Sequence, residues 1–280
     1  DIHKSTWQNE ANTYDVIIWQ PRSTPDLLPE AKSKIYFLEK YLKKRCFPSF
    51  DQLWSYEDKI HASFLYNHFR LPAIPTFSTY SKSDALEFAD KTEYPVVSKI
   101  TTGSASCGVV KLENKKSLVR YINSTFSGIG RKTYWPFIRQ INYVYFQQFI
   151  HTAKFDLRII IVGTKFFGYY RFPKKGDFRA SGAGNVLKKE LPEEAMRLAL
   201  KTKETLNAIS MAVDMLFSER EQKYYIIETS IFCGIDTAEQ LVVDGIAGFY
   251  EYEGDKFTFR EGRFWIQELA LQEFFKSITY

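Results

Sequence analysis

Residues 94–112 read YPVVSKITTGSASCGVVKL, and this stretch decides the fold that we expect. The apolar run at its start predicts a strand that ends at Lys99, and residues 109–112 predict a second strand. The small residues between them predict a loop that offers backbone N–H groups and hydroxyls to a phosphate, while the lysine neutralises phosphate charge. The alternative is an ordinary hairpin loop. A Walker A motif is excluded, because two valines rather than Lys-Ser/Thr follow the loop.

Two carboxylates stand near the edges of two later predicted strands. Asp214 lies in the strand predicted over residues 213–217, and Glu228 ends the strand predicted over residues 224–228. Neighbouring antiparallel strands would bring both carboxylates together, and magnesium prefers one or two carboxylates together with phosphate oxygens. The alternative is a pair of solvated acids on a hairpin. The apolar residues before Glu228 favour a buried carboxylate, which needs a partner such as a metal ion.

A polar loop over residues 173–184 carries Arg179 among small residues. The planar guanidinium group of an arginine suits a phosphate or a carboxylate. For a single arginine the alternative is a solvated surface position.

The rest of the pattern mixes helices and strands, which favours α+β layers over a simple doubly wound sheet. Further predicted strands and helices lie at 15–19 (a buried strand), 29–45 (helix), 57–69 (helix), 84–91 (a helix capped by Ser83), from Ser117 (helix), 144–150 (strand), 157–170 (a hairpin that turns at Gly163-Thr164), 193–209 (helix) and 265–280 (helix). We expect the last helix to pack on the core, and a homodimer contact is the alternative.

The composition excludes several classes of protein. The 280 residues are 45% hydrophobic, with a net charge of +5, and fit a soluble protein or one with an anionic substrate. No block of Lys and Arg stands out, so we expect no nucleic acid partner. No apolar stretch is long enough for a membrane helix, and we expect no membrane partner. The three separated cysteines predict neither a zinc site nor a disulfide framework, and they suit the cytoplasm.

The order of these features over residues 55–235 resembles the ATP-grasp superfamily, and in particular the ribosomal-protein glutamate ligases and their relatives, the RimK-like group. A weaker likeness, carried by GDFRASG at 176–182, is to ATP-grasp proteins of cell-surface polysaccharide synthesis. The resemblance implies an α+β ATP-grasp fold, in which two α/β subdomains grip ATP between antiparallel sheets. We expect a short N-terminal α/β piece over 1–57, a lid subdomain with the glycine-rich loop over 58–150, and a C-terminal subdomain with the metal site over 151–280.

The resemblance also implies site residues. The phosphates of ATP would contact Lys59, Lys99 and the loop residues Gly103, Ser104 and Gly108. The adenine would lie against Gln148, Phe149 and Ile150, and the ribose against Asp156, which is followed by Arg158 in the family's pattern. The transferred phosphate or acyl phosphate would lie against Arg179 and Ser181, so that Lys99, Arg158 and Arg179 are the expected catalytic residues. The magnesium ligands would be Asp214, Glu228 and Ser230, and manganese can take the place of magnesium.

The activity that the resemblance implies is magnesium- and ATP-dependent ligation of a carboxylate to an amine through an acyl phosphate. An amino acid or an acidic sugar is the expected carboxylate, and the partners are a small-molecule or peptide carboxylate and an amine. Two departures keep alternatives open, because Gln148 stands where the family has glutamate and Ser230 where it has asparagine. One alternative is an ATP-binding protein with degenerate catalysis, and another is an ATP-grasp kinase that phosphorylates a hydroxyl.

Overall fold

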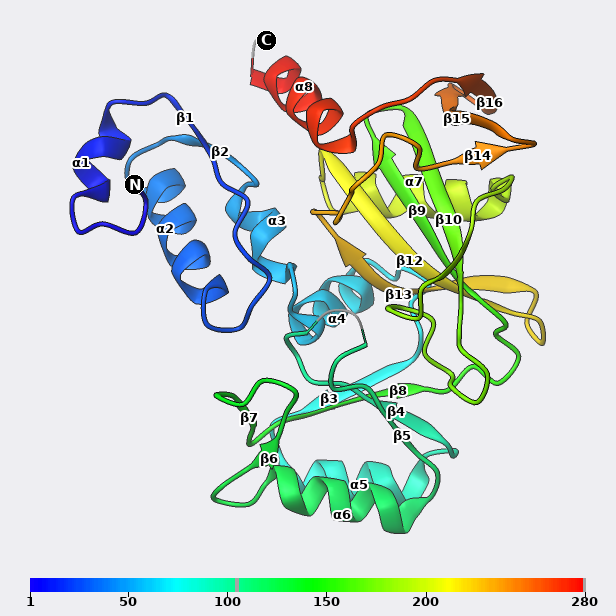
Figure 1. Ribbon diagram of the computed structural model, residues 1–280. Coiled ribbons are helices and arrows are strands. Elements are labelled where there is room, and N and C mark those ends of the chain that lie inside the picture. Colours follow the sequence, from blue (N-terminus) through cyan, green and yellow to red (C-terminus); the bar gives the residue numbers. More distant parts are fainter. Residues whose placement is uncertain (104–105, 279–280) are drawn as a thin grey trace.

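The computed structural model describes residues 1–103 and 106–278, which form three packed groups of elements (Figure 1). The N-terminal group has a parallel pair of strands, β1 and β2. The core of this group includes Leu53 and the buried face of helix α2. That face carries Leu28, Ala31, Ile35 and Leu38, at the spacing of one helical stripe. The elements of this group are α1 (Trp7–Asn12), β1 (Val16–Ile18), α2 (Leu28–Lys40), β2 (Arg45–Phe47) and α3 (Phe50–Ser55).

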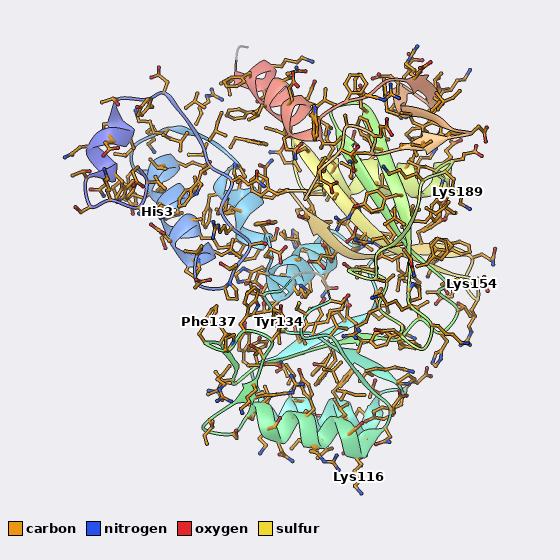
Figure 2. All side chains as sticks on the ribbon, in the orientation of Figure 1. His3, Lys116, Tyr134, Phe137, Lys154 and Lys189 are labelled. Carbon is orange, nitrogen blue, oxygen red and sulfur yellow. The ribbon has the colours of Figure 1, made fainter. Side chains whose placement is uncertain are left out.

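The second group is a four-stranded antiparallel sheet in the order β3-β8-β4-β5, with two helices packed on it (Figure 1). Its elements are β3 (Thr76–Thr79), α5 (Lys82–Lys91), β4 (Val96–Ser98), β5 (Val110–Leu112), α6 (Lys115–Thr125) and β8 (Val144–Gln148). The short strands β6 (Arg131–Lys132) and β7 (Arg139–Gln140) pair with each other. The segment between them presents Tyr134 and Phe137 to solvent (Figure 2).

The third group is an eight-stranded sheet with the order β13-β12-β9-β10-β15-β14, in which β11 pairs with β10 and β16 pairs with β15. Its strands are β9 (Asp156–Val162), β10 (Lys165–Phe172), β11 (Asn185–Leu187), β12 (Ser210–Ser218), β13 (Lys223–Ser230), β14 (Val242–Val243), β15 (Ile246–Glu253) and β16 (Lys256–Glu261). Helices α4 (Lys59–His68), α7 (Glu193–Thr205) and α8 (Ile266–Ile278) pack against it. The apolar run of β9 is buried almost throughout, because helices lie against it.

The two antiparallel sheets and the mixed layers confirm the predicted fold class. The predicted domain boundaries stay a prediction. Helix α4, which the sequence places in the lid, shares the core of the large sheet through Ala62 and Tyr66. Helix α8 also packs there, through Phe274. No helix in the described ranges combines the length and the apolar character that crossing a membrane requires.

Several predicted boundaries were wrong. The helix predicted over 29–45 ends at Lys40, and Arg45 begins β2. The strand predicted over 15–19 is only half-buried, and Ile18 is exposed. The helix predicted from Ser117 begins at Lys115, because Asn114 caps it and forms a reciprocal capping box with Ser117. The helix predicted over 193–209 ends at Thr205, because Ser210 starts β12.

The predicted cap of the helix over 84–91 was also wrong. The helix begins at Lys82, and the hydroxyl of Ser81 rather than Ser83 accepts a hydrogen bond from the backbone N–H of Asp84 at 3.3 Å. We expect Ser81→Ala to lower the free energy of unfolding by about 1 kcal/mol, since it leaves an N–H at the helix start unpaired. Ser83→Ala, the matched control, should change it by less than about 0.5 kcal/mol. Urea denaturation of the three proteins measures both, and equal losses would contradict this assignment of the cap.

Candidate functional site

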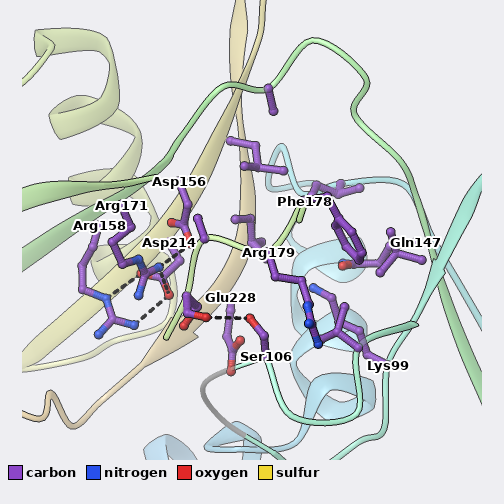
Figure 3. Close-up of a pocket in the computed structure, with 18 of the residues that line it drawn as sticks. Lys99, Ser106, Gln147, Asp156, Arg158, Arg171, Phe178, Arg179, Asp214 and Glu228 are labelled. Carbon is purple, nitrogen blue, oxygen red and sulfur yellow. Dashed lines mark hydrogen bonds and ion pairs between the residues drawn. The ribbon is translucent and has the colours of Figure 1, made fainter. Parts of the chain in front are cut away.

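A cavity of about 670 Å³ lies between the two antiparallel sheets and is also lined from the N-terminal group (Figure 3). It brings together most of the residues that the sequence singles out. These are Lys59, Lys99, Gly103, Gln148, Phe149, Ile150, Asp156, Arg158, Arg179, Ser181, Asp214, Glu228 and Ser230. Gly108 is not among the lining residues, and its backbone instead lies against Ile100. Ser104 lies outside the described residues. The predicted roles of all these residues stay predictions.

Two lysines reach the cavity from different elements. Lys59 starts α4, where Asp58 caps the helix by accepting from the N–H of His61, and its Nζ donates to the carbonyl of Gly103 at 2.7 Å. The same Nζ lies 3.4 Å from Oε1 of Glu228. Lys99 follows β4 and is 8% exposed. Its burial lowers the pKa of its ammonium group to about 8, against the attraction of Glu228. The site therefore holds one lysine that bridges to the glycine-rich loop and one whose charge lacks hydration.

A buried group of two carboxylates and two arginines occupies the large-sheet side of the cavity (Figure 3). Arg158 donates to both oxygens of Asp214, from Nε and Nη2, at 2.7 Å each. Arg171 lies 2.8 Å from the same carboxylate and 2.6 Å from Asp156. The two arginines hold the pKa of Asp214 well below its usual range despite burial. Burial and the neighbouring Asp214 raise the pKa of Asp156 to about 6.

Arg171 was missed by the sequence analysis, in which the predicted hairpin ended at residue 170. The turn at Gly163-Thr164 pairs β9 with β10 so that Arg171 lies opposite Asp156. The next pairing, of β9 with β12, sets Arg158 opposite Asp214. Asp156, expected at the ribose, is therefore held inside this ion cluster, and its buried Oδ1 has no hydrogen-bond partner in the part of the chain that the structure describes.

The predicted metal ligands lie on two paired strands. Asp214 on β12 is the register partner of Glu228 on β13, so the two residues lie on adjacent antiparallel strands as predicted, and their joint role as metal ligands stays a prediction. The Glu228 side chain is 30% exposed, and the hydroxyl of Ser230 donates to the carbonyl of Phe232 at 2.5 Å. No group of three or more His, Cys, Asp or Glu side chains within 1–103 and 106–278 is arranged to hold a metal. Carboxylate and hydroxyl oxygens suit magnesium, and Glu228 is accessible, whereas both oxygens of Asp214 already accept from Arg158.

Two loops meet over the cavity. The hydroxyl of Ser106, in the glycine-rich loop, donates to the carbonyl of Ser181 at 3.0 Å, so Ser106 contacts the loop over residues 173–184 (Figure 3). In that second loop Arg179 pairs with Asp177, with Nη2 and Oδ2 2.8 Å apart. Because the Arg179 side chain is 43% exposed, this pairing does not prevent it from binding a phosphate in the cavity.

The strand expected to bind adenine forms one wall. The N–H of Gln148 donates to the carbonyl of Pro75 at 3.0 Å, and the buried amide of Gln147 donates to Tyr145 and to Thr76. Phe149 packs edge-on to Phe178, with ring centroids 5.7 Å apart. Phe149, Ile150 and Phe178 give this wall an apolar surface, which suits a flat heterocycle. Phe178 comes from the loop over 173–184 and was not among the residues expected here.

Family comparison supports the resemblance. The model of the family described as "RimK-like ATP-grasp domain" matches residues 57–247. The α-aminoadipate–LysW ligase LysX of Saccharolobus solfataricus is 27% identical over 177 residues, which are 62% of this chain and 61% of the relative. The chain therefore spans about three fifths of the length of that curated relative.

Solved structures agree in fold. A structure described as the ADP complex of N5-carboxyaminoimidazole ribonucleotide synthetase aligns with a TM-score of 0.60 at 15% identity, over 85% of this chain and 61% of that one. A RimK-domain ATP-grasp protein of Sphaerobacter thermophilus aligns with a TM-score of 0.53 at 13% identity, over 78% of this chain and 73% of that one. These similarities concern the arrangement of helices and strands.

Proposed function

Because the chain belongs to the RimK-like ATP-grasp family, we propose that it is a magnesium- and ATP-dependent ligase that activates a carboxylate as an acyl phosphate and joins it to an amine. One observation carries the proposal: Lys59, Lys99 and the carboxylate of Glu228 line one cavity between two antiparallel sheets. Cations that neutralise phosphates next to a carboxylate that suits magnesium form the charge pattern that phosphoryl transfer needs.

The side chains that line the cavity would have different roles in the reaction, according to their positions. Lys59 and Lys99 would neutralise the phosphates of ATP while the substrate carboxylate attacks the γ-phosphorus. Arg179 would hold the acyl phosphate with its planar guanidinium group. The contact of Ser106 with Ser181 would help to keep water from the acyl phosphate until an amine attacks the acyl carbon and phosphate leaves. A magnesium ion held by Glu228, Asp214 and Ser230 would supply further charge neutralisation.

The first test is formation of a hydroxamate. The protein is incubated with MgATP, hydroxylamine as a general amine, and a panel of carboxylates that contains amino acids, α-aminoadipate among them, and acidic sugars. We expect ADP, phosphate and hydroxamate with one class of carboxylate. Glu228→Ala should lower the rate at least about a hundredfold, because charge stabilisation worth several kcal/mol is lost. Glu87→Gln, on the exposed face of α5, is the matched control and should keep the rate.

One observation favours a second candidate, an ATP-binding protein with degenerate catalysis. Both oxygens of Asp214 accept from arginines, so this carboxylate has less capacity for a metal ion than Glu228. Gln148 and Ser230, which replace the family's usual glutamate and asparagine, point the same way. ATP binding without ADP from any carboxylate would favour that candidate. ADP and a phosphorylated hydroxyl compound without hydroxamate would identify a kinase, and absence of ATP binding would contradict all three.

A further inference from the structure

Glu57 lines the same cavity, yet none of the steps above uses it. It directly precedes the Asp58 cap of α4, and it lies where the N-terminal group contributes Ser23 and Tyr56 to the wall. Phe232 and Gly234 line the cavity as well. Glu57 and Lys59, the lysine expected to bind phosphate, line the same cavity, and Lys59 is among the charged groups that act on the Glu57 carboxyl.

The backbone holds Glu57 in a conformation that favours glycine, with φ of +52°. The hydrogen bonds on its C-terminal side fix this arrangement. The N–H of Asp58 donates to the carbonyl of Ser55 at 3.1 Å, and the N–H of Lys59 donates to the carbonyl of Thr101 at 3.0 Å. A glutamate in a left-handed conformation is strained. Such strain concentrates at functional sites, where a role of the side chain in function offsets its energetic cost.

The carboxyl group of Glu57 has a buried oxygen, Oε2, to which no group within residues 1–103 and 106–278 donates a hydrogen bond. The charged groups that act on it are Glu228, Lys59, Arg158 and Lys32. Burial, followed by repulsion from Glu228, raises the pKa of this carboxyl to about 7, against the attraction of the three cations. A buried acceptor without a donor is costly. A ligand that carries a positive charge and N–H donors would remove that cost, whereas phosphates would be repelled.

We propose that Glu57 binds the amine substrate, accepting hydrogen bonds from an amine that is cationic in solution. The bound ammonium group loses a proton to water before its nitrogen attacks the acyl carbon and phosphate leaves. The inference rests on the proposed ligase function and adds the acceptor side of the site to it. It assigns side chains of opposite charge in one cavity to the two substrates. Lys59, Lys99 and Arg179 take the phosphates, while Glu57 takes the ammonium group.

The test compares two small amines in the full chain. Ammonium chloride supplies a charged amine, and hydroxylamine is largely uncharged at neutral to mildly alkaline pH. Glu57→Gln keeps a hydrogen-bond acceptor and removes the charge. We expect it to raise the KM for ammonium, measured as primary amide formed, at least about tenfold, because a hydrogen bond between two charged groups is replaced by a weaker one to a neutral amide oxygen. The KM for hydroxylamine should change less than about twofold, and the KM for ATP should not change.

A second variant protects the test from a folding defect. Glu57→Gly suits the positive φ and removes the strained side chain, so we expect it to unfold at a higher temperature than the wild type while showing the same separation between the two amines. Glu87→Gln is the surface control for both readouts.

Three results would overturn the inference while the ligase function stands. The first is hydroxamate but no amide from ammonium in the wild type. The second is an unchanged KM for ammonium in Glu57→Gln. The third is a rise in the KM for hydroxylamine or for ATP that equals the rise in the KM for ammonium. The last result would place Glu57 on the nucleotide side of the cavity. Absence of hydroxamate from the wild type is a different failure, in which the ligase function falls and the inference falls with it.

Discussion

Asp214→Ala is expected to lower the free energy of unfolding by about 3–5 kcal/mol and to abolish hydroxamate formation, because removal of one partner leaves buried charges uncompensated. Arg158 and Arg171 both donate to this carboxylate, whose side chain is 10% exposed. Without it, Arg158 would lose the carboxylate to which it donates two hydrogen bonds, and Arg171 would keep its contact with Asp156. Asp214→Ala should therefore lower the free energy of unfolding far more than a variant that breaks an exposed ion pair.

The measurement is urea denaturation of Asp214→Ala beside Asp177→Ala. The second variant breaks the exposed Asp177–Arg179 pair, and we expect it to cost less than about 1 kcal/mol. The double variant Arg158→Leu/Asp214→Leu should recover part of the loss, since it removes one charge of each sign. If Asp214→Ala unfolds at the same urea concentration as Asp177→Ala, the ion cluster is more hydrated than the structure implies.

The pH dependence of this loss has a definite sign. The pKa of Asp214 is well below its usual range in the folded protein, so its contribution to stability is fully present above the pKa of an unfolded aspartate, about 3.9, and is lost only in strong acid. Asp156 acts in the opposite sense. Because its pKa is raised to about 6 in the folded protein, the folded state binds more protons than the unfolded state between roughly pH 4 and 6. Stability therefore falls as the pH rises through that range.

Local patterns predicted much of the fold. The apolar run of β9 and the Gly163-Thr164 turn are short-range signals, and the structure places a hairpin there. The helical stripe of α7 likewise needs no distant partner. Helix ends were less predictable, because neighbouring polar residues compete for the same backbone N–H groups. Ser81 and Ser83 are two residues apart, and only the geometry of the first turn decides that Ser81 caps the helix.

The residues of the candidate site also differ in how far the sequence alone could identify them. Lys59, Lys99, Asp214 and Glu228 could be named because their order along the chain resembles a family, and the structure brings them to one cavity. Arg171 could not, because its contact with Asp214 depends on strand pairings across both sides of β9. Glu57 carries no sequence signal beyond its position, since neither its positive φ nor its unpartnered oxygen is visible in a string of residues. The positions of Arg171 and Glu57 in the site both depend on packing between segments that are distant in the sequence.

Lys99→Met is expected to separate activity from stability. Methionine keeps much of the length and apolar character of the lysine stem and removes the charge, so hydroxamate formation should fall at least about a hundredfold, because a cation aimed at developing phosphate charge is lost. The free energy of unfolding at neutral pH should rise, by up to about 3 kcal/mol, because the protein no longer buries an ammonium group whose pKa is lowered to about 8.

The sign follows from proton linkage. An unfolded lysine has a pKa of about 10.4, and the folded one about 8, so between these values the unfolded state binds more protons and wild-type stability rises with pH. The advantage of Lys99→Met should therefore be full below pH 8 and should disappear as the pH approaches about 10.4. Lys116→Met, on the exposed face of α6 (Figure 2), is the matched control and should change neither rate nor stability appreciably. Urea denaturation at several pH values and the hydroxamate assay measure both effects. If Lys99→Met is less stable than the wild type at neutral pH, Lys99 supports the fold through its charge, and its place in the cavity would no longer argue for a phosphate ligand.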